Sequence, residues 1–141
     1  VTDRFGVSAQ GNVQALALQK ERKAHALVAT RLGRYSAILC DRSVLDAPVY
    51  VHSQGDELGA QGLLDRVRTW IPTYSRIFLL DPADVPYSQD DIRAEDETTR
   101  QLFHDTFLDF FNTNELPYQL LSGNQDERLQ QVNEFIGSGR L

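Results

Sequence analysis

Residues 76–82 read Arg-Ile-Phe-Leu-Leu-Asp-Pro, and this stretch decides the fold class of the chain. It is a continuous apolar run that ends in an acid and a proline, as expected for a strand buried on both faces of a sheet. Two further short apolar runs, residues 36–40 and 118–121, have the same form. Stretches with helical spacing separate the three runs. Strands alternating with helices predict an α/β domain in three layers, with a parallel sheet covered on both faces.

The expected helices are amphipathic. The first spans residues 12–31 and starts at Asn12, a good N-cap residue. Others are expected over residues 60–70, from Asp96 onward, and over residues 126–136, whereas residues 46–52 are ambiguous. The inward-facing stripe predicted for the first helix is Val13, Leu16, Ala17, Lys20, Ala24, Leu27 and Val28, with Lys20 contributing its aliphatic stem.

Length and composition bound the class of protein. A chain of 141 residues is large enough to bury a core, so a single domain over residues 1–141 is expected. No run approaches the roughly 20 apolar residues that cross a bilayer, so we expect no membrane partner. The one cysteine, Cys40, excludes an internal disulfide and suits a reducing, cytoplasmic compartment; in its apolar run it should act as a small hydrophobe.

The charge balance argues against nucleic acid as a partner. The formal net charge is −6, and no dense Lys/Arg cluster is present. The nearest group, Lys20, Arg22 and Lys23, is better explained as the solvated side of a helix. We therefore expect a nucleotide or another small molecule as the partner.

Parallel sheets bind ligands outside the carboxyl ends of their strands, so three places are candidates. The first is Asp41-Arg42-Ser43, directly after the run at residues 36–40. An acid there can hold a hydrated Mg²⁺ or accept a proton, and an arginine can bind phosphate through two donors. A turn with an internal ion pair is an equally good explanation. The same two explanations, a functional acid or a structural ion pair, apply to Asp46, for which the functional one has weaker support.

The second and third places follow the other two apolar runs. The acidic loop after Asp81 carries Arg93, which could act as a lid arginine on a transferring phosphoryl group. On composition alone, a solvated loop is favoured two to one. Tyr87 could stack on a ring or cover the strand edge. Gly123 and Asn124 could shape a purine pocket, although a plain strand-to-helix turn is the more common case.

Several sequence patterns are absent. The three histidines, His25, His52 and His104, share no metal-ligand spacing. The chain contains neither G-x-x-x-x-G-K-[ST] nor G-x-G-x-x-G, so it has no phosphate-binding loop of a known kind.

The order of parts nevertheless resembles a known family. Its most specific stretches are residues 78–93, which begin with FLLDPADVPY, and residues 116–129, which contain LPYQLLSG and DERL, with Asp41-Arg42 before them. The pattern looks like the P-loop ATPase/kinase family that includes the ribosylnicotinamide kinase domain of bacterial NAD-synthesis proteins. It is more distantly similar to thymidylate and deoxynucleoside kinases.

The resemblance implies a role for each matching residue. Asp41 would be the acid that accompanies Mg²⁺ or accepts a proton, and Arg42 would contact phosphate or substrate. Arg93 would be the lid arginine that reaches the phosphates of ATP, and Gly123 and Asn124 would border the adenine. The first strand, the phosphate loop and the second strand of the family would lie before residue 1, so this chain is expected to be a P-loop kinase-type fold without its first strand–loop–helix.

The function expected from this resemblance is phosphoryl transfer from ATP, with Mg²⁺, to a small nucleoside-like or nucleotide-like metabolite, in a protein that has the phosphate loop. Asp46 and Tyr87 are the candidates for substrate contact. Two alternatives stay open. One is a non-catalytic binding or assembly module that forms a homo-oligomer, and the other is an ATPase that drives a partner protein.

Overall fold

The computed structural model describes residues 4–31, 33–83 and 97–138. The chain divides into two compact units, Val1–Thr73 and Tyr74–Leu141. Each unit is described by itself below. The expectation of a single domain over residues 1–141 stays a prediction.

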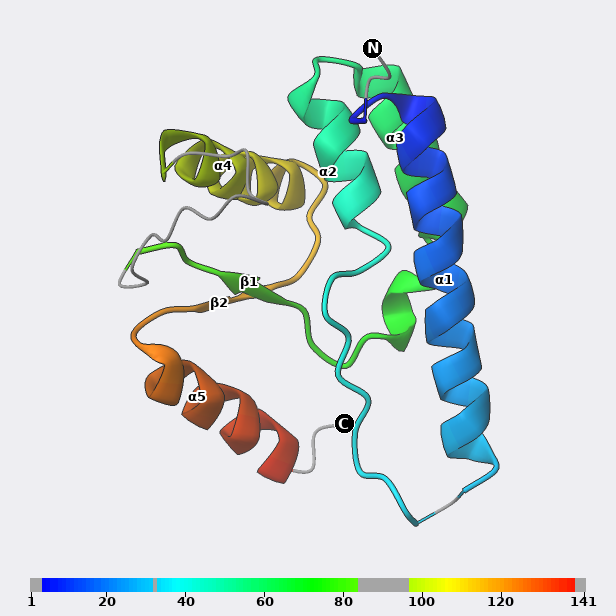
Figure 1. Cartoon of the computed structure of the whole chain (residues 1–141), viewed down its shortest axis with the longest axis vertical. Helices are drawn as coiled ribbons and strands as arrows, with labels where there is room; N and C mark the ends of the chain where they lie inside the picture. The colour runs from blue at the N-terminus through cyan, green and yellow to red at the C-terminus, as the bar shows by residue number, and fades with distance from the viewer. Residues whose placement is uncertain (1–3, 32, 84–96, 139–141) are drawn as a thin grey trace. The chain divides into compact units, whose positions relative to one another are not determined.

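The first unit is helical (Figure 1). It contains α1 (Val7–Ala29), α2 (Asp46–Ser53), α3 (Glu57–Val67) and the short 3-10 helix η1 (Ile71–Thr73). Helix α2 packs against both α1 and α3. Asp56 caps α3 by accepting a hydrogen bond from the Gly59 N–H at 2.9 Å. The core between the helices is formed by Val44, Leu45, Ala47, Val49, Val51, Ala60, Leu63, Leu64 and Val67.

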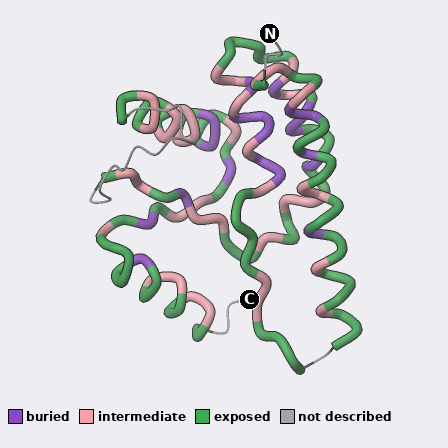
Figure 2. The backbone as a smooth tube through the Cα atoms, viewed as in Figure 1, coloured by how far each residue is buried: buried purple, intermediate pink, exposed green. Residues whose placement is uncertain are grey.

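The predicted inward face of α1 is wrong in part. Ala17, Ala24 and Val28 are half-buried, whereas Val13, Leu16, Lys20 and Leu27 are exposed and polar residues occupy the most buried positions. Val13, Leu16 and Leu27 are 51%, 59% and 47% exposed. Figure 2 shows most of α1 as exposed, with buried positions along one side. The buried residues are Gln10, Gly11, Gln14 and Glu21.

Hydrogen bonds explain why α1 has this orientation. Gln14 Nε2 donates to the carbonyl oxygens of Val44, at 3.2 Å, and Leu63, at 2.8 Å. Glu21 Oε1 accepts from Trp70 Nε1 at 3.1 Å. Buried carbonyl and indole groups need such partners, and an apolar stripe on this side of α1 could not supply them.

The strand predicted at residues 36–40 is also wrong, since the structure gives these residues no strand. Leu39 is 72% exposed and Cys40 is exposed, so Cys40 is not the small core residue expected from the sequence. A strand requires a neighbouring strand to pair with its N–H and C=O groups. Among the described residues, β1 and β2 pair only with each other.

The second unit confirms the α/β class and the parallel sheet. Strands β1 (Phe78–Leu80) and β2 (Gln119–Leu121) are parallel, with Leu79 opposite Leu120. Helices α4 (Glu97–Thr113) and α5 (Gln125–Gly137) lie on opposite sides of this strand pair in Figure 1. The buried apolar residues of this unit are Leu79, Phe110, Phe111, Leu116 and Leu121.

The two units differ in charge. The first carries nine Lys and Arg against seven Asp and Glu, and the second carries five against thirteen. The formal charges are therefore +2 and −8, which add to the −6 of the whole chain. No helix in the described part of the chain is both long and apolar enough to cross a membrane.

Candidate functional site

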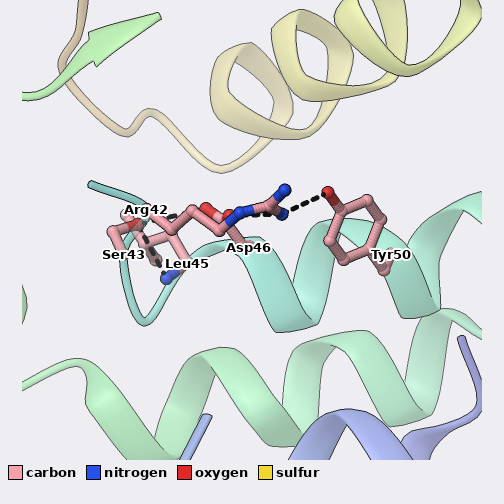
Figure 3. A network of polar contacts seen from close by, with 5 residues as sticks. All are labelled: Arg42, Ser43, Leu45, Asp46 and Tyr50. Carbon is pink, nitrogen blue, oxygen red and sulfur yellow. Dashed lines mark hydrogen bonds and ion pairs between the residues drawn. The ribbon is translucent and has the colours of Figure 1, made fainter. Parts of the chain in front are cut away.

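A cluster of polar side chains lies at the start of α2 (Figure 3). Arg42 has a φ of +72°, a left-handed conformation that is uncommon for a residue with a side chain. Ser43 then forms the turn that opens the helix, because its Oγ accepts from Leu45 N at 3.0 Å and its carbonyl accepts from Asp46 N at 3.2 Å. Backbone strain of this kind is often found at functional sites, where the surrounding contacts maintain it.

Helix α2 brings two partners to the Arg42 guanidinium. Asp46 and Tyr50 are four residues apart and therefore lie on one face of the helix. Arg42 Nη1 donates to the Tyr50 hydroxyl at 3.2 Å and lies 3.8 Å from Asp46 Oδ2. The Arg42 side chain is still 71% exposed. Because a guanidinium has five N–H donors, the group can also bind an anion from solution.

Asp46 has the properties of a proton-transfer group. Its side chain is 17% exposed, and burial raises its pKa to about 6, against the opposing effects of Arg42 and of hydrogen bonds at Ser43. A carboxyl group with a pKa near neutrality can accept and release a proton at working pH. The pKa of Arg42 is raised, first by Tyr50 and its hydrogen bond, so this residue stays a cation.

Asp41 is exposed beside Arg42 in the chain. Magnesium is commonly held by one or two carboxylates together with phosphate oxygens of the substrate. A role of Asp41 as a ligand of a phosphate-bound Mg²⁺ stays a prediction. In the described ranges, no group of three or more His, Cys, Asp or Glu could hold a metal.

Gly123 and Asn124 lie in the second unit, where β2 leads into α5. Gly123 has a φ of +93°, a conformation that glycine adopts without strain. Asn124 is the N-cap of α5 and forms a capping box with Glu127, in which both reciprocal hydrogen bonds are present. The sequence-predicted strand-to-helix turn is therefore confirmed, and its proposed adenine contact stays a prediction.

Arg128 ties this turn to the end of the neighbouring strand. Its Nε donates to the Gly123 carbonyl at 2.7 Å, and its Nη2 donates to the carbonyls of Asp81 and Ala83. Arg128 is 9% exposed, so a buried cation links the carboxyl ends of β1 and β2. Among the described residues, all hydrogen bonds of this cation go to carbonyl oxygens, which offset the cost of burying its charge.

The structure brings together only part of the predicted site. Arg42 and Asp46 are in contact, with Asp41 next to them in the chain, whereas Gly123 and Asn124 belong to the other unit. Tyr87 and Arg93 lie outside the described residues. Asp41-Arg42-Ser43 does not follow a buried strand as predicted, because residues 36–40 form none.

Sequence reasoning missed Tyr50 and Arg128. Tyr50 was missed because residues 46–52 have too short a helical pattern to show that Asp46 and Tyr50 share a face. Arg128 entered the sequence analysis only within residues 126–129, and no local pattern indicates that an arginine will turn back to three carbonyls. The pKa of the Cys40 thiol is raised, first by the partial burial of the sulfur and then by Glu21, which disfavours the thiolate form.

Comparison with known proteins gives one match. The family model described as an AAA domain matches residues 6–128, well over half of the chain. The matched region contains the Arg42 cluster, both strands and the capped start of α5. No curated protein and no solved structure matches the chain significantly.

Proposed function

Because the chain belongs to the AAA-domain family, which is of P-loop NTPase type, we propose that it takes part in ATP-dependent phosphoryl transfer to a small nucleoside-like or nucleotide-like metabolite. The family itself supports nucleotide binding with ATPase or kinase activity in general. The kinase reaction, the acceptor and any role in NAD metabolism are the proposal.

The observation that carries the proposal is the pairing of an exposed arginine with a mostly buried carboxyl at the start of α2. Arg42 is held by Tyr50 at 3.2 Å while most of its side chain faces solvent. Asp46, 3.8 Å away, has a pKa of about 6. Phosphoryl transfer to an alcohol requires a cation that binds the phosphate and a base that removes the hydroxyl proton. Arg42 and Asp46 place these two groups side by side.

Each residue has a distinct role in the proposal. The hydroxyl oxygen of the acceptor bonds to the terminal phosphorus of ATP, and the bond between that phosphorus and ADP breaks. Asp46 accepts the proton that the hydroxyl loses. Arg42 binds phosphate oxygens, and Tyr50 positions the guanidinium. Asp41 would be a ligand of Mg²⁺, which supplies charge neutralisation when bound. Gly123 and Asn124 would border the adenine.

Two residues enter the proposal from the sequence alone. Arg93 is proposed as the lid arginine, and Tyr87 is proposed to contact the acceptor. The roles of Arg42 and Asp46, by contrast, rest on described contacts.

The direct test is acceptor-dependent release of ADP by the natural full-length protein, measured with Mg-ATP and a panel of nucleosides and nucleotides. A kinase forms phosphorylated acceptor and ADP in equal amounts. ADP released at the same rate without any acceptor would instead indicate an ATPase that serves a partner protein. A protein that has no affinity for Mg-ATP and forms a stable oligomer would be a binding or assembly module.

Substitutions then test the site. Asp46→Asn should lower kcat by roughly 10²–10⁴-fold, because it removes the proton acceptor. The activity of the natural protein should fall below pH 6 as Asp46 becomes protonated, and the residual activity of Asp46→Asn should not show this fall. Arg42→Gln should lower kcat/KM by about 10²-fold. Arg68→Gln is the matched control, since Arg68 is paired with Asp65 on α3 at 2.6 Å. Unchanged turnover in Asp46→Asn and Arg42→Gln would refute the site.

A further inference from the structure

The segment just before α1 contacts the Arg42 cluster from a distant part of the sequence. The Phe5 ring lies against the Tyr50 ring of α2, with ring centres 5.1 Å apart and ring planes tilted by 35°. Tyr50 in turn accepts a hydrogen bond from the Arg42 guanidinium at 3.2 Å. We propose that Phe5 is a positioning residue, which orients Tyr50 and through it holds the guanidinium beside Asp46. This role deepens the proposed function, and its effect on turnover rests on that function.

The Arg42 guanidinium needs support from a neighbour to keep one position. Its side chain is 71% exposed and its contact with Asp46 is long, 3.8 Å, and an ion pair as open to solvent as this one contributes little by itself. Figure 3 shows the guanidinium reaching over the start of α2 to the Tyr50 hydroxyl. That hydrogen bond can fix the direction of the guanidinium only if the Tyr50 ring is itself fixed.

Phe5 packs on the Tyr50 ring in a favourable arrangement. Aromatic rings attract one another when they are offset or tilted with their centres about 4.5–7 Å apart, and this pair meets both conditions. Tyr50 is half-buried, so its ring can turn about its side-chain bonds unless a neighbour packs against it. Because the hydroxyl is at the far end of the ring, any such turn displaces the hydroxyl. Phe5 therefore controls the place of the atom to which Arg42 donates.

The segment that carries Phe5 is itself anchored to α1. Gln10 is 6% exposed, and its Nε2 donates to the Arg4 carbonyl at 2.6 Å. The Gly6 carbonyl accepts from Gln10 N at 3.0 Å, so the segment leads directly into the first turn of the helix. The Arg4 guanidinium lies 4.6 Å from the centre of the Phe5 ring, where a cation and an aromatic face attract each other. The ring is thus held from α1 and can support a residue on α2.

Asp46 provides a measure of whether the Arg42 guanidinium is in place. Burial raises the pKa of Asp46, and Asp41 adds a little to the rise. The charge of Arg42 is the largest of the opposing effects, followed by the hydrogen bonds of Ser43. If the guanidinium is no longer held beside the carboxyl group, the pKa of Asp46 should rise further above 6. A side chain that only contributes to folding elsewhere would leave this pKa unchanged.

The test measures the pKa of Asp46 by NMR, following the isotope-labelled carboxyl carbon through a pH titration of the natural full-length protein and its variants. The signal that Asp46→Asn lacks identifies the residue. Arg42→Gln gives the full effect of losing the guanidinium, an increase of about one pH unit. Phe5→Leu and Tyr50→Phe should each raise the pKa by at least about half as much. Phe5→Tyr keeps the ring and should restore the natural value.

Phe135→Leu is the matched control. Phe135 is also half-buried and also contacts another ring, that of Phe78, but both residues belong to the second unit. This variant should leave the pKa of Asp46 unchanged. Circular dichroism checks that each variant is folded, and Phe5→Met replaces Phe5→Leu if the latter does not fold. If neither folds, Phe5 supports the unit as a whole, and the positioning role is overturned. An unchanged pKa in Phe5→Leu or Tyr50→Phe, or an equal rise in Phe135→Leu, would overturn it as well.

Turnover separates this role from the proposed function. In the assay of acceptor-dependent ADP release, Phe5→Leu should lower kcat/KM by about tenfold, because the phosphate-binding cation is displaced, and Phe5→Tyr should recover most of the loss. A natural protein without phosphoryl transfer would refute the proposed function, whereas the NMR titration would still decide whether Phe5 positions Arg42. A raised pKa of Asp46 in Phe5→Leu with unchanged kcat/KM would overturn the link between this contact and catalysis.

Discussion

The two units of this chain reach their folds by different means. In the second unit, two of the apolar runs become paired strands as the sequence pattern indicates, and Phe110 and Phe111 of α4 enter the core. In the first unit, α1 turns polar residues inward, because Gln14 hydrogen-bonds the carbonyls of Val44 and Leu63 and Glu21 accepts from the Trp70 indole. The comparison teaches that hydrophobic periodicity predicts packing only where the neighbouring surface has no polar groups to satisfy.

The largest effect on stability is expected in the second unit, at Arg128. Replacing Arg128 by Met should lower the free energy of unfolding by about 3 kcal/mol, because three carbonyl groups lose a buried donor. Chemical denaturation measures this change. Gln130→Met, an exposed change on the same helix, is the control and should have an effect below about 0.5 kcal/mol. Equal stability of Arg128→Met and the control would show that the cation is not a structural link.

The next effect concerns Asp46 in the first unit and depends on pH. Its folded pKa is about 6, raised from 3.8, so the protonated form favours folding. The contribution of this group is fully present below pH 3.8 and is lost as the pH rises through 6. Asp46→Asn does not titrate, so at pH 7 it should be more stable than the natural protein by up to about 3 kcal/mol.

Thermal or denaturant unfolding at pH 4 and pH 7 gives the comparison. The difference between Asp46→Asn and the natural protein should nearly vanish at pH 4. A variant that is less stable at pH 7 would mean that the pairing with Arg42 outweighs the cost of burying the charge. A gain in stability together with a loss of turnover would be typical of a residue kept for function.

A smaller loss is expected at Gln14, where the polar packing of α1 can be tested. Gln14→Leu should lower the free energy of unfolding by about 1–2 kcal/mol, because the carbonyls of Val44 and Leu63 lose their donor. The loss is limited because the unpartnered Oε1 disappears too. Hydrogen exchange of the α1 amides would locate the effect. A stabilised Gln14→Leu protein would show that the polar contacts do not orient α1.

The smallest effect is expected on the opposite side of the same helix. Leu16 is 59% exposed, so Leu16→Gln should change the free energy of unfolding by less than about 0.5 kcal/mol. Denaturation of the isolated protein measures it. A loss of 2 kcal/mol or more would mean that the apolar stripe of α1 is buried in solution, and the contrast between the two units would then fail.

The candidate site was predictable in part. Asp41, Arg42 and Asp46 follow from a simple rule, since acids and arginines next to an apolar run are candidates for phosphate chemistry. Their arrangement was not predictable, because the left-handed Arg42 and its contact with Tyr50 depend on a helix too short to recognise. The Arg128 contacts and the packing of Phe5 on Tyr50 join residues about 45 positions apart, which no local pattern reports.

By itself, the sequence determined the α/β class, the two strands that pair, the strand-to-helix turn before α5 and the acid–arginine pair before α2. These features depend on short-range patterns, namely apolar runs, turn residues and neighbouring charges. Only the tertiary structure decided which face of α1 is buried, that residues 36–40 form no strand, and that Asp46 titrates near pH 6. Each of these depends on what lies opposite a residue in space, because burial, strand pairing and pKa are set by neighbours that the local sequence does not contain.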